Sequence, residues 1–110
     1  MEALFPLRHV LVFRWRFGEA RDLDELMRRM GERMFYAIRP AEDVLVATSK
    51  TKPSAVIFVF LREGDDGGRL ILIQTPGGRY SYPQLVHYVR IFAKTVGIEV
   101  GEEITLAPRG

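Results

Sequence analysis

The chain has 110 residues, of which 47% are hydrophobic and 27% are charged, and it contains no cysteine. This length and composition are typical of one globular domain and exclude a largely disordered chain. The absence of cysteine excludes disulfides, thiolate metal sites and thiol catalysis. The formal net charge is only +2, so a surface that binds nucleic acid would need its basic residues clustered.

The distribution of apolar residues argues against a membrane protein. The longest unbroken apolar run, residues 55–61, is far shorter than the roughly 20 residues that cross a bilayer. The first residues lack the basic and apolar segments of a secretory signal. We therefore expect a single domain, residues 1–110, that is cytoplasmic and does not bind a membrane.

The choice of polar residues indicates a stable protein. The chain has no asparagine, and its basic residues are 13 arginines and 3 lysines. Loss of thermolabile amides and thiols is typical of proteins from hot environments, although a GC-rich genome also favours arginine. We expect a thermophilic source and a melting midpoint above the ordinary range of about 45–65 °C.

The first two predicted elements are a strand and a helix. Residues 7–17 alternate, with apolar side chains mostly at odd positions and Arg14 and Arg16 at even ones, which is the period of a strand. Asp22 then resembles a helix N-cap. Arg39-Pro40 predicts the end of this helix, because a residue before proline avoids the helical region. One face of the helix is predicted to pack on the sheet: Leu23, Leu26, Met27, Met30 and Met34.

Three strands and a second helix follow. The strands are predicted at about residues 44–49, 54–63 and 69–75, and Gly64 to Gly68 form a strong hairpin signal between the last two. The second helix begins at a capping box of Ser81 and Gln84 and ends at Gly97. A short final strand is predicted near residues 103–106.

The order of elements is β-α-β-β-β-α, with a final β. This order favours an α+β fold, with an antiparallel sheet of four to five strands and two helices on one face. Its start and end resemble ferredoxin-like domains with an added hairpin strand, a likeness of topology that implies no function. The strand order and register stay open.

Both sides of the predicted central strands are apolar, since residues 56–61 and 70–73 contain no polar side chain. Two helices can cover only one face of such a sheet, so the other face should be covered by a loop, a second subunit or a ligand. The argument fails if the chain's own helices and loops bury four residues of these strands: Phe58, Phe60, Leu70 and Leu72.

The principal functional hypothesis is a non-catalytic domain that binds single-stranded DNA or RNA. Aromatic rings on a sheet can stack bases while neighbouring arginines hold phosphates. Whether the arginines and phenylalanines share one face depends on the register. The plain alternative places the phenylalanines in the core and the arginines in solvent. The candidate binding residues are Arg14, Arg16, Lys50, Lys52, Phe58, Phe60 and Arg62.

A second hypothesis uses the same sheet differently. An apolar face could build a homodimer or dock another protein, which would make the chain a protein-interaction module. The two hypotheses differ in chemistry, because phosphate contacts weaken steeply with salt and an apolar interface does not.

A weaker candidate site lies between the last central strand and the second helix. Gly77, Gly78 and Arg79 could hold an anion through backbone N–H groups, the helix N-terminus and a guanidinium. The alternative is ordinary turn chemistry. Asp65 and Asp66 lie at a hairpin tip, a poor place for metal or acid–base geometry. We expect no catalytic residues, metal or cofactor.

Overall fold

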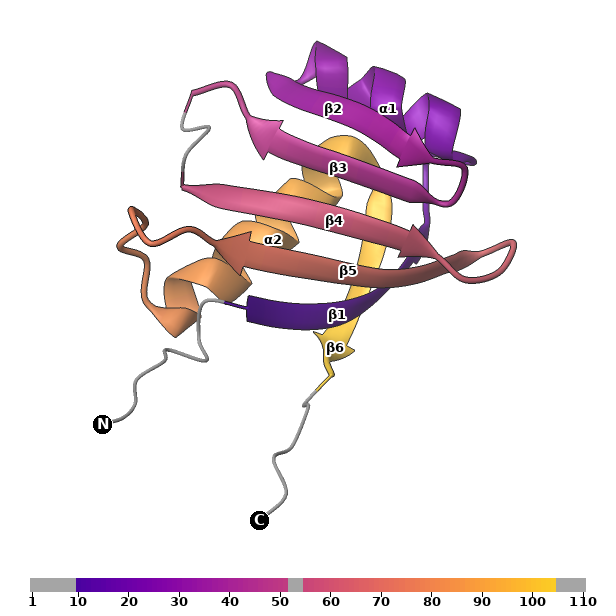
Figure 1. The fold of residues 1–110 in the computed structure, drawn as a ribbon. Coiled ribbons are helices and arrows are strands. Elements are labelled where there is room, and N and C mark those ends of the chain that lie inside the picture. The colour runs from indigo at the N-terminus through magenta and orange to yellow at the C-terminus, as the bar shows by residue number, and fades with distance from the viewer. Residues whose placement is uncertain (1–9, 52–54, 105–110) are drawn as a thin grey trace.

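Six strands and two helices follow one another in the computed structural model, which describes residues 10–51 and 55–104 (Figure 1). The elements, in chain order, are β1 (Val10–Phe17), α1 (Leu23–Glu32), β2 (Phe35–Ala41), β3 (Val44–Ser49), β4 (Val56–Arg62), β5 (Gly67–Gln74), α2 (Tyr82–Val96) and β6 (Ile98–Glu103).

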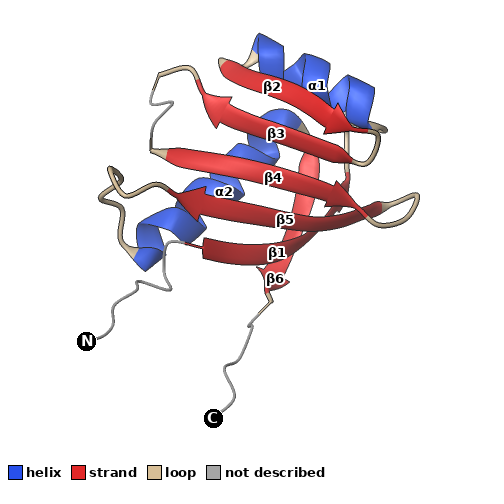
Figure 2. Ribbon diagram, in the orientation of Figure 1, coloured by secondary structure: helices blue, strands red, loops and turns tan. Residues whose placement is uncertain are grey.

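All the strands form one sheet in the order β2-β3-β4-β5-β1-β6, and every neighbouring pair is antiparallel. It follows that α1 joins two parallel strands, β1 and β2, which have three strands between them. Similarly, α2 joins β5 to β6 across β1. Both helices lie behind the sheet in Figure 2. The α+β class and the antiparallel sheet are therefore confirmed, and the sheet is wider than the sequence predicted.

The helix starts follow the predicted caps. The Asp22 side chain accepts a hydrogen bond from the Glu25 backbone N–H at 2.8 Å, and α1 buries Leu23, Leu26 and Met30. Ser81 and Gln84 form the reciprocal capping box of α2, and Gly97 ends this helix with a φ of 88°. A local capping box thus determines where α2 begins, and a left-handed glycine determines where it ends.

The predicted end of the first helix is wrong. The helix stops at Glu32 and not at Arg39, and residues 35–41 form β2. Met34 has a φ of 70° and is 56% exposed, so it reverses the chain and does not extend the buried stripe. Pro40 is compatible with a strand here because β2 is at the edge of the sheet.

The last strand also differs from its prediction. β6 covers Ile98–Glu103, directly after α2, whereas residues 105–106 lie outside the described residues. The left-handed Gly97 turns the chain so that Ile98 pairs with Phe17 and Val100 with Trp15. The run Gly101-Glu102-Glu103 obscures this strand in the sequence.

The core lies between the sheet and the two helices. Phe58 of β4 stacks on Phe92 of α2, with ring centroids 3.8 Å apart. The register pairs Phe58 with Leu72 and Phe60 with Leu70, so all four side chains share the helix-covered face. All four have no exposed area. The chain's own helices therefore account for the burial of all four residues. The prediction that something else covers the opposite face gains no support from them.

Candidate functional site

The face of the sheet opposite the helices carries apolar side chains, and we call it the open face. No described element covers it, and it faces the viewer in Figure 1. The register aligns its side chains in rows across the strands. One row contains Val10, Ile73, Ile57, Thr48 and Tyr36; the next contains Val12, Ile71, Val59, Val46 and Ile38; the third contains Arg14, Arg69, Leu61 and Val44.

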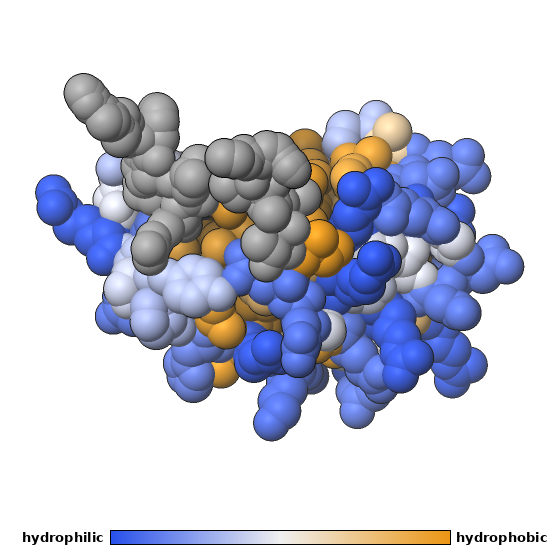
Figure 3. Space-filling view, turned by 90° about the horizontal axis from the view of Figure 1, so that it is seen from below, coloured by the Kyte–Doolittle hydropathy of each residue, from blue (hydrophilic) through white to orange (hydrophobic). Residues whose placement is uncertain are grey.

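The open face is separate from the core. None of its apolar residues belongs to the core cluster or packs against it. Val59 and Ile71, at the centre, are half-buried, and Val12 of β1 is buried, with 8% of its area exposed. Exposure is greatest at the two sides, where Tyr36 is 57%, Ile38 60% and Val10 49% exposed. Figure 3 shows hydrophobic residues gathered in the upper half of the molecule when it is viewed from below.

The third row leads into an open hollow of about 650 Å³ beside the β4–β5 hairpin. Arg14 and Arg16 line it from β1, and Glu63, Asp65, Asp66 and Glu99 also line it. Two guanidinium groups therefore face four carboxylates. This balance does not favour a polyanion, which would meet more repulsion than attraction there.

Acidic neighbours neutralise most of the basic residues at this end. Arg16 Nε lies 2.8 Å from Glu99 Oε1, and Arg69 Nε donates to Glu63 Oε2 at 2.7 Å. The bond from Arg69 is also the main reason that the pKa of Glu63 lies below its usual value. Arg14 is exposed and makes no ion pair with any residue of the described ranges.

The predicted grouping of arginines with phenylalanines is wrong. Arg14 and Arg16 lie on the open face, whereas Phe58 and Phe60 are fully buried on the other face. A base can stack only on a ring that solvent reaches, so these two rings cannot serve as stacking platforms in this structure. The plain alternative, in which they belong to the core, is the one observed.

The remaining predicted basic residues are also dispersed. Arg62 lies on the same side of β4 as the buried phenylalanines, and its Nε donates to Asp43 Oδ1 at 2.9 Å. This hydrogen bond raises the pKa of Arg62. Lys50 lies at the end of β3, with Nζ 5.2 Å from the centroid of the Tyr36 ring. Lys52 lies outside the described residues.

The predicted anion loop is organised by Gln74, the last residue of β5. Its Oε1 accepts from the Tyr80 N–H at 2.7 Å, and its Nε2 donates to the Tyr80 carbonyl at 3.1 Å. The Gly78 N–H donates to the Thr75 carbonyl at 2.8 Å. A Cβ at Gly78 would lie 2.5 Å from the Gln74 side chain, which explains the glycine. The geometry is that of a turn, and Arg79 is exposed beside it.

A smaller hollow of about 230 Å³ lies where the end of β3 and the start of β4 meet α2. Ser49, Thr51, Tyr80 and Tyr88 line it together with two apolar residues. Burial raises the pKa of the Tyr88 hydroxyl, and a hydrogen bond with Ser49 opposes this effect. At neutral pH the hydroxyl is therefore a neutral hydrogen-bonding group. The sequence contained no signal for this hollow, because its residues come from four separate segments.

The described part of the chain contains neither a cluster of metal-binding side chains nor a membrane-spanning helix. Among residues 10–51 and 55–104, no group of three His, Cys, Asp or Glu side chains could hold a metal ion. No helix in the same ranges has the length and apolar composition needed to span a membrane. The chain matches no family model, and neither a curated protein nor a solved structure is significantly similar to it.

Proposed function

We propose that this protein is a non-catalytic homodimerisation domain and that the open face is its interface. The observation that supports this proposal is the continuous apolar surface over β2, β3, β4, β5 and β1, which lies outside the core. An antiparallel sheet with one solvated face normally alternates apolar and polar residues. Here β4 presents Ile57, Val59 and Leu61 to the open face, and burial of these side chains in an interface would remove them from water.

The size of the surface is sufficient for a second copy of the chain. Five strands about 4.8 Å apart and three side-chain rows about 6.8 Å apart span roughly 490 Å². Two such faces would bury about 1,000 Å² in total, which is the lower limit for a specific interface.

Nucleic-acid binding has less support. It needs exposed aromatic rings beside unpaired arginines, whereas Phe58 and Phe60 are buried and Arg16 is paired with Glu99. Arg14 alone keeps an unpaired guanidinium among the described open-face arginines. Binding of single-stranded DNA or RNA therefore remains a prediction of the sequence analysis that an experiment should test.

Sedimentation velocity over the micromolar range tests the dimer. The wild-type chain should shift from monomer to dimer as its concentration rises. Val59→Glu places a carboxylate at the centre of the open face, and its burial would cost several kcal/mol, so this variant should remain monomeric. Circular dichroism should show a folded protein, because Val59 does not pack against the core.

Ile91→Glu is the matched control. Ile91 lies on α2, is 49% exposed and does not belong to the open face. The same change in charge and hydrophobicity there should leave dimerisation unaltered. A wild-type chain that stays monomeric at every concentration, or a Val59→Glu variant that dimerises normally, would contradict the proposal.

A further inference from the structure

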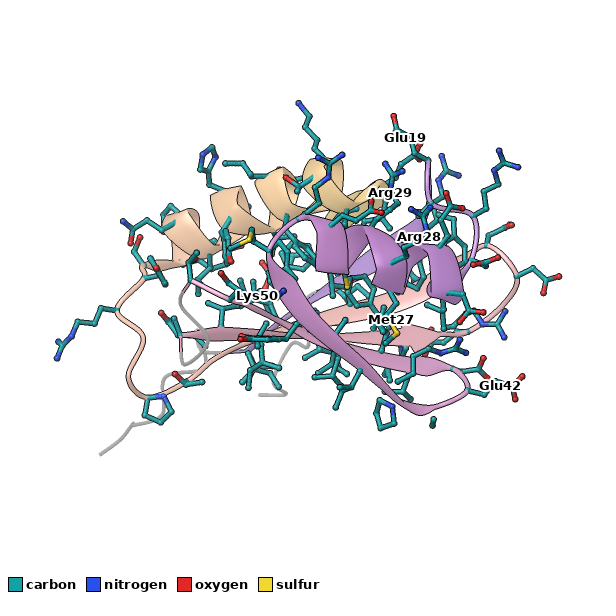
Figure 4. All side chains as sticks on the ribbon, turned by 90° about the horizontal axis from the view of Figure 1, so that it is seen from above. Glu19, Met27, Arg28, Arg29, Glu42 and Lys50 are labelled. Carbon is teal, nitrogen blue, oxygen red and sulfur yellow. The ribbon has the colours of Figure 1, made fainter. Side chains whose placement is uncertain are left out.

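We infer that the two copies pack around a two-fold axis that runs across the strands, so that Lys50 of each copy faces Glu42 of the other. This inference rests on the proposed dimer and adds its geometry. It begins from two exposed, oppositely charged residues on one hairpin, β2–β3. Figure 4 shows Lys50 and Glu42 at opposite ends of this hairpin.

Neither charge forms a salt bridge within the described part of the chain, and Glu42 interacts electrostatically with Arg62 at longer range. Lys50 makes no ion pair there, and its Nζ lies over the Tyr36 ring at the side of the open face. Its backbone N–H donates to the Met34 carbonyl at 2.9 Å, which holds this residue against the start of β2. Glu42 lies in the two-residue turn between Ala41 and Val44, which are paired. Its carboxylate also makes no ion pair with the described residues.

A two-fold axis in the plane between two faces can run along the strands or across them. An axis along the strands would place the β2 side of one copy over the β1 side of the other. Lys50 would then lie near Val10, an apolar residue that offers its charge no partner. Removing an ammonium from water without a partner is unfavourable.

An axis across the strands superimposes the β2–β3 hairpin on the same hairpin of the second copy, running in the opposite direction. Its Lys50 end then lies over the Glu42 end of the second copy. Because the interface is isologous, the pair occurs twice. Strands of the two sheets would be nearly aligned, as in face-to-face packing at about 30°.

The arginine end of the open face is compatible with this arrangement. Arg69 is hydrogen-bonded to Glu63, and Arg14 lines the hollow at the β4–β5 hairpin. Both side chains therefore lie at the end of the sheet that carries this hairpin. The aliphatic stems of such side chains can cover apolar residues while the charged groups remain in water. In the second copy, these stems would meet the row that contains Val10 and Ile73.

Charge reversal in two separate proteins provides the test. Lys50→Glu should weaken self-association about tenfold at low salt, because it creates two carboxylate pairs. Glu42→Lys should weaken it similarly through two ammonium pairs. Mixing the two variants should give a heterodimer with nearly wild-type affinity, because both pairs again have opposite charges. Lys94→Glu, which makes the same charge change as Lys50→Glu but lies exposed on α2, should not weaken the dimer.

The outcomes separate the two proposals. A wild-type monomer at all concentrations would overturn both the dimer and its geometry. A wild-type dimer that both charge reversals leave intact, or a mixture of the two variants that fails to associate more tightly than either alone, would overturn the geometry and leave the proposed function standing. Sedimentation velocity of the mixture, with one variant fluorescently labelled, measures heterodimer formation directly.

Discussion

Both faces of the sheet are apolar on the central strands β4 and β5, but their surroundings are very different. On β4, Phe58 is fully buried beneath α2, and its neighbour Val59 is half-buried on the open face. β5 repeats the contrast with Leu72 and Ile71. The side chains of a strand alternate between faces, so one apolar run can supply both a core and an external surface. The covered face stabilises the monomer, and the open face is available for association.

Truncating neighbouring residues should give the largest difference between the faces. Phe58→Ala should destabilise the monomer by about 3–5 kcal/mol, because it leaves a cavity against Phe92. Val59→Ala should cost less than about 1.5 kcal/mol, since only strand propensity and partial burial are lost. Urea unfolding at a concentration where the protein is monomeric measures both changes. Equal losses would show that the open face is part of the core.

Thermal unfolding of the wild-type protein tests its predicted thermal stability. The wild-type midpoint is predicted to lie above the ordinary range of about 45–65 °C. A reversible melt within that range would leave genome composition as the explanation for the abundance of arginine.

A second comparison concerns the two helices that cover the core. Arg29 of α1 donates from Nε to the Val96 carbonyl at the end of α2 at 3.1 Å and lies 2.6 Å from Glu19. Figure 4 shows Arg29 and Glu19 on the helix side of the sheet. Arg29→Ala should therefore destabilise the monomer by about 1–2 kcal/mol, because a cation that bonds the last carbonyl of α2 is removed.

Arg28 provides the matched control for this prediction. It is exposed on the same helix, and among the described residues it is paired only with Glu25 and Glu32. Arg28→Ala should cost less than about 0.5 kcal/mol, as expected for exposed helical pairs. If the two substitutions lowered the free energy of unfolding equally little, the contact between α1 and the end of α2 would not contribute measurably to the stability of the monomer.

The smallest expected effect is that of two arginine substitutions on the affinity for single-stranded nucleic acid. Fluorescence anisotropy with a labelled single-stranded oligonucleotide at low and moderate salt measures binding directly. If binding occurs through β1, Arg14→Ala combined with Arg16→Ala should lower affinity for all sequences and flatten the salt slope by about two units at most. Absence of binding by the wild-type protein at tens of micromolar in low salt would eliminate this hypothesis.

Much of the fold was predictable because its signals are local. The alternation in β1, the Gly-rich hairpin between β4 and β5, and the capping box at Ser81 depend on residues close together in sequence. β2 was missed because Met34 continues the helical spacing of Met27 and Met30. Its left-handed backbone conformation, which ends that continuity, is visible only in the structure.

The candidate surface was only partly predictable. The sequence alone indicated that both sides of the central strands are apolar and that Arg14 and Arg16 share one side, because strand alternation requires it whatever the pairing. It could not place Phe58 and Phe60 relative to those arginines, since the faces of two strands are related only by their register. The observed register decided this, because it aligns Arg14 with Arg69 and Leu61 on one face and Phe58 with Leu72 and Leu11 on the other. Both helices pack on the phenylalanine side, and no described element lies over the isoleucines and valines of the opposite side.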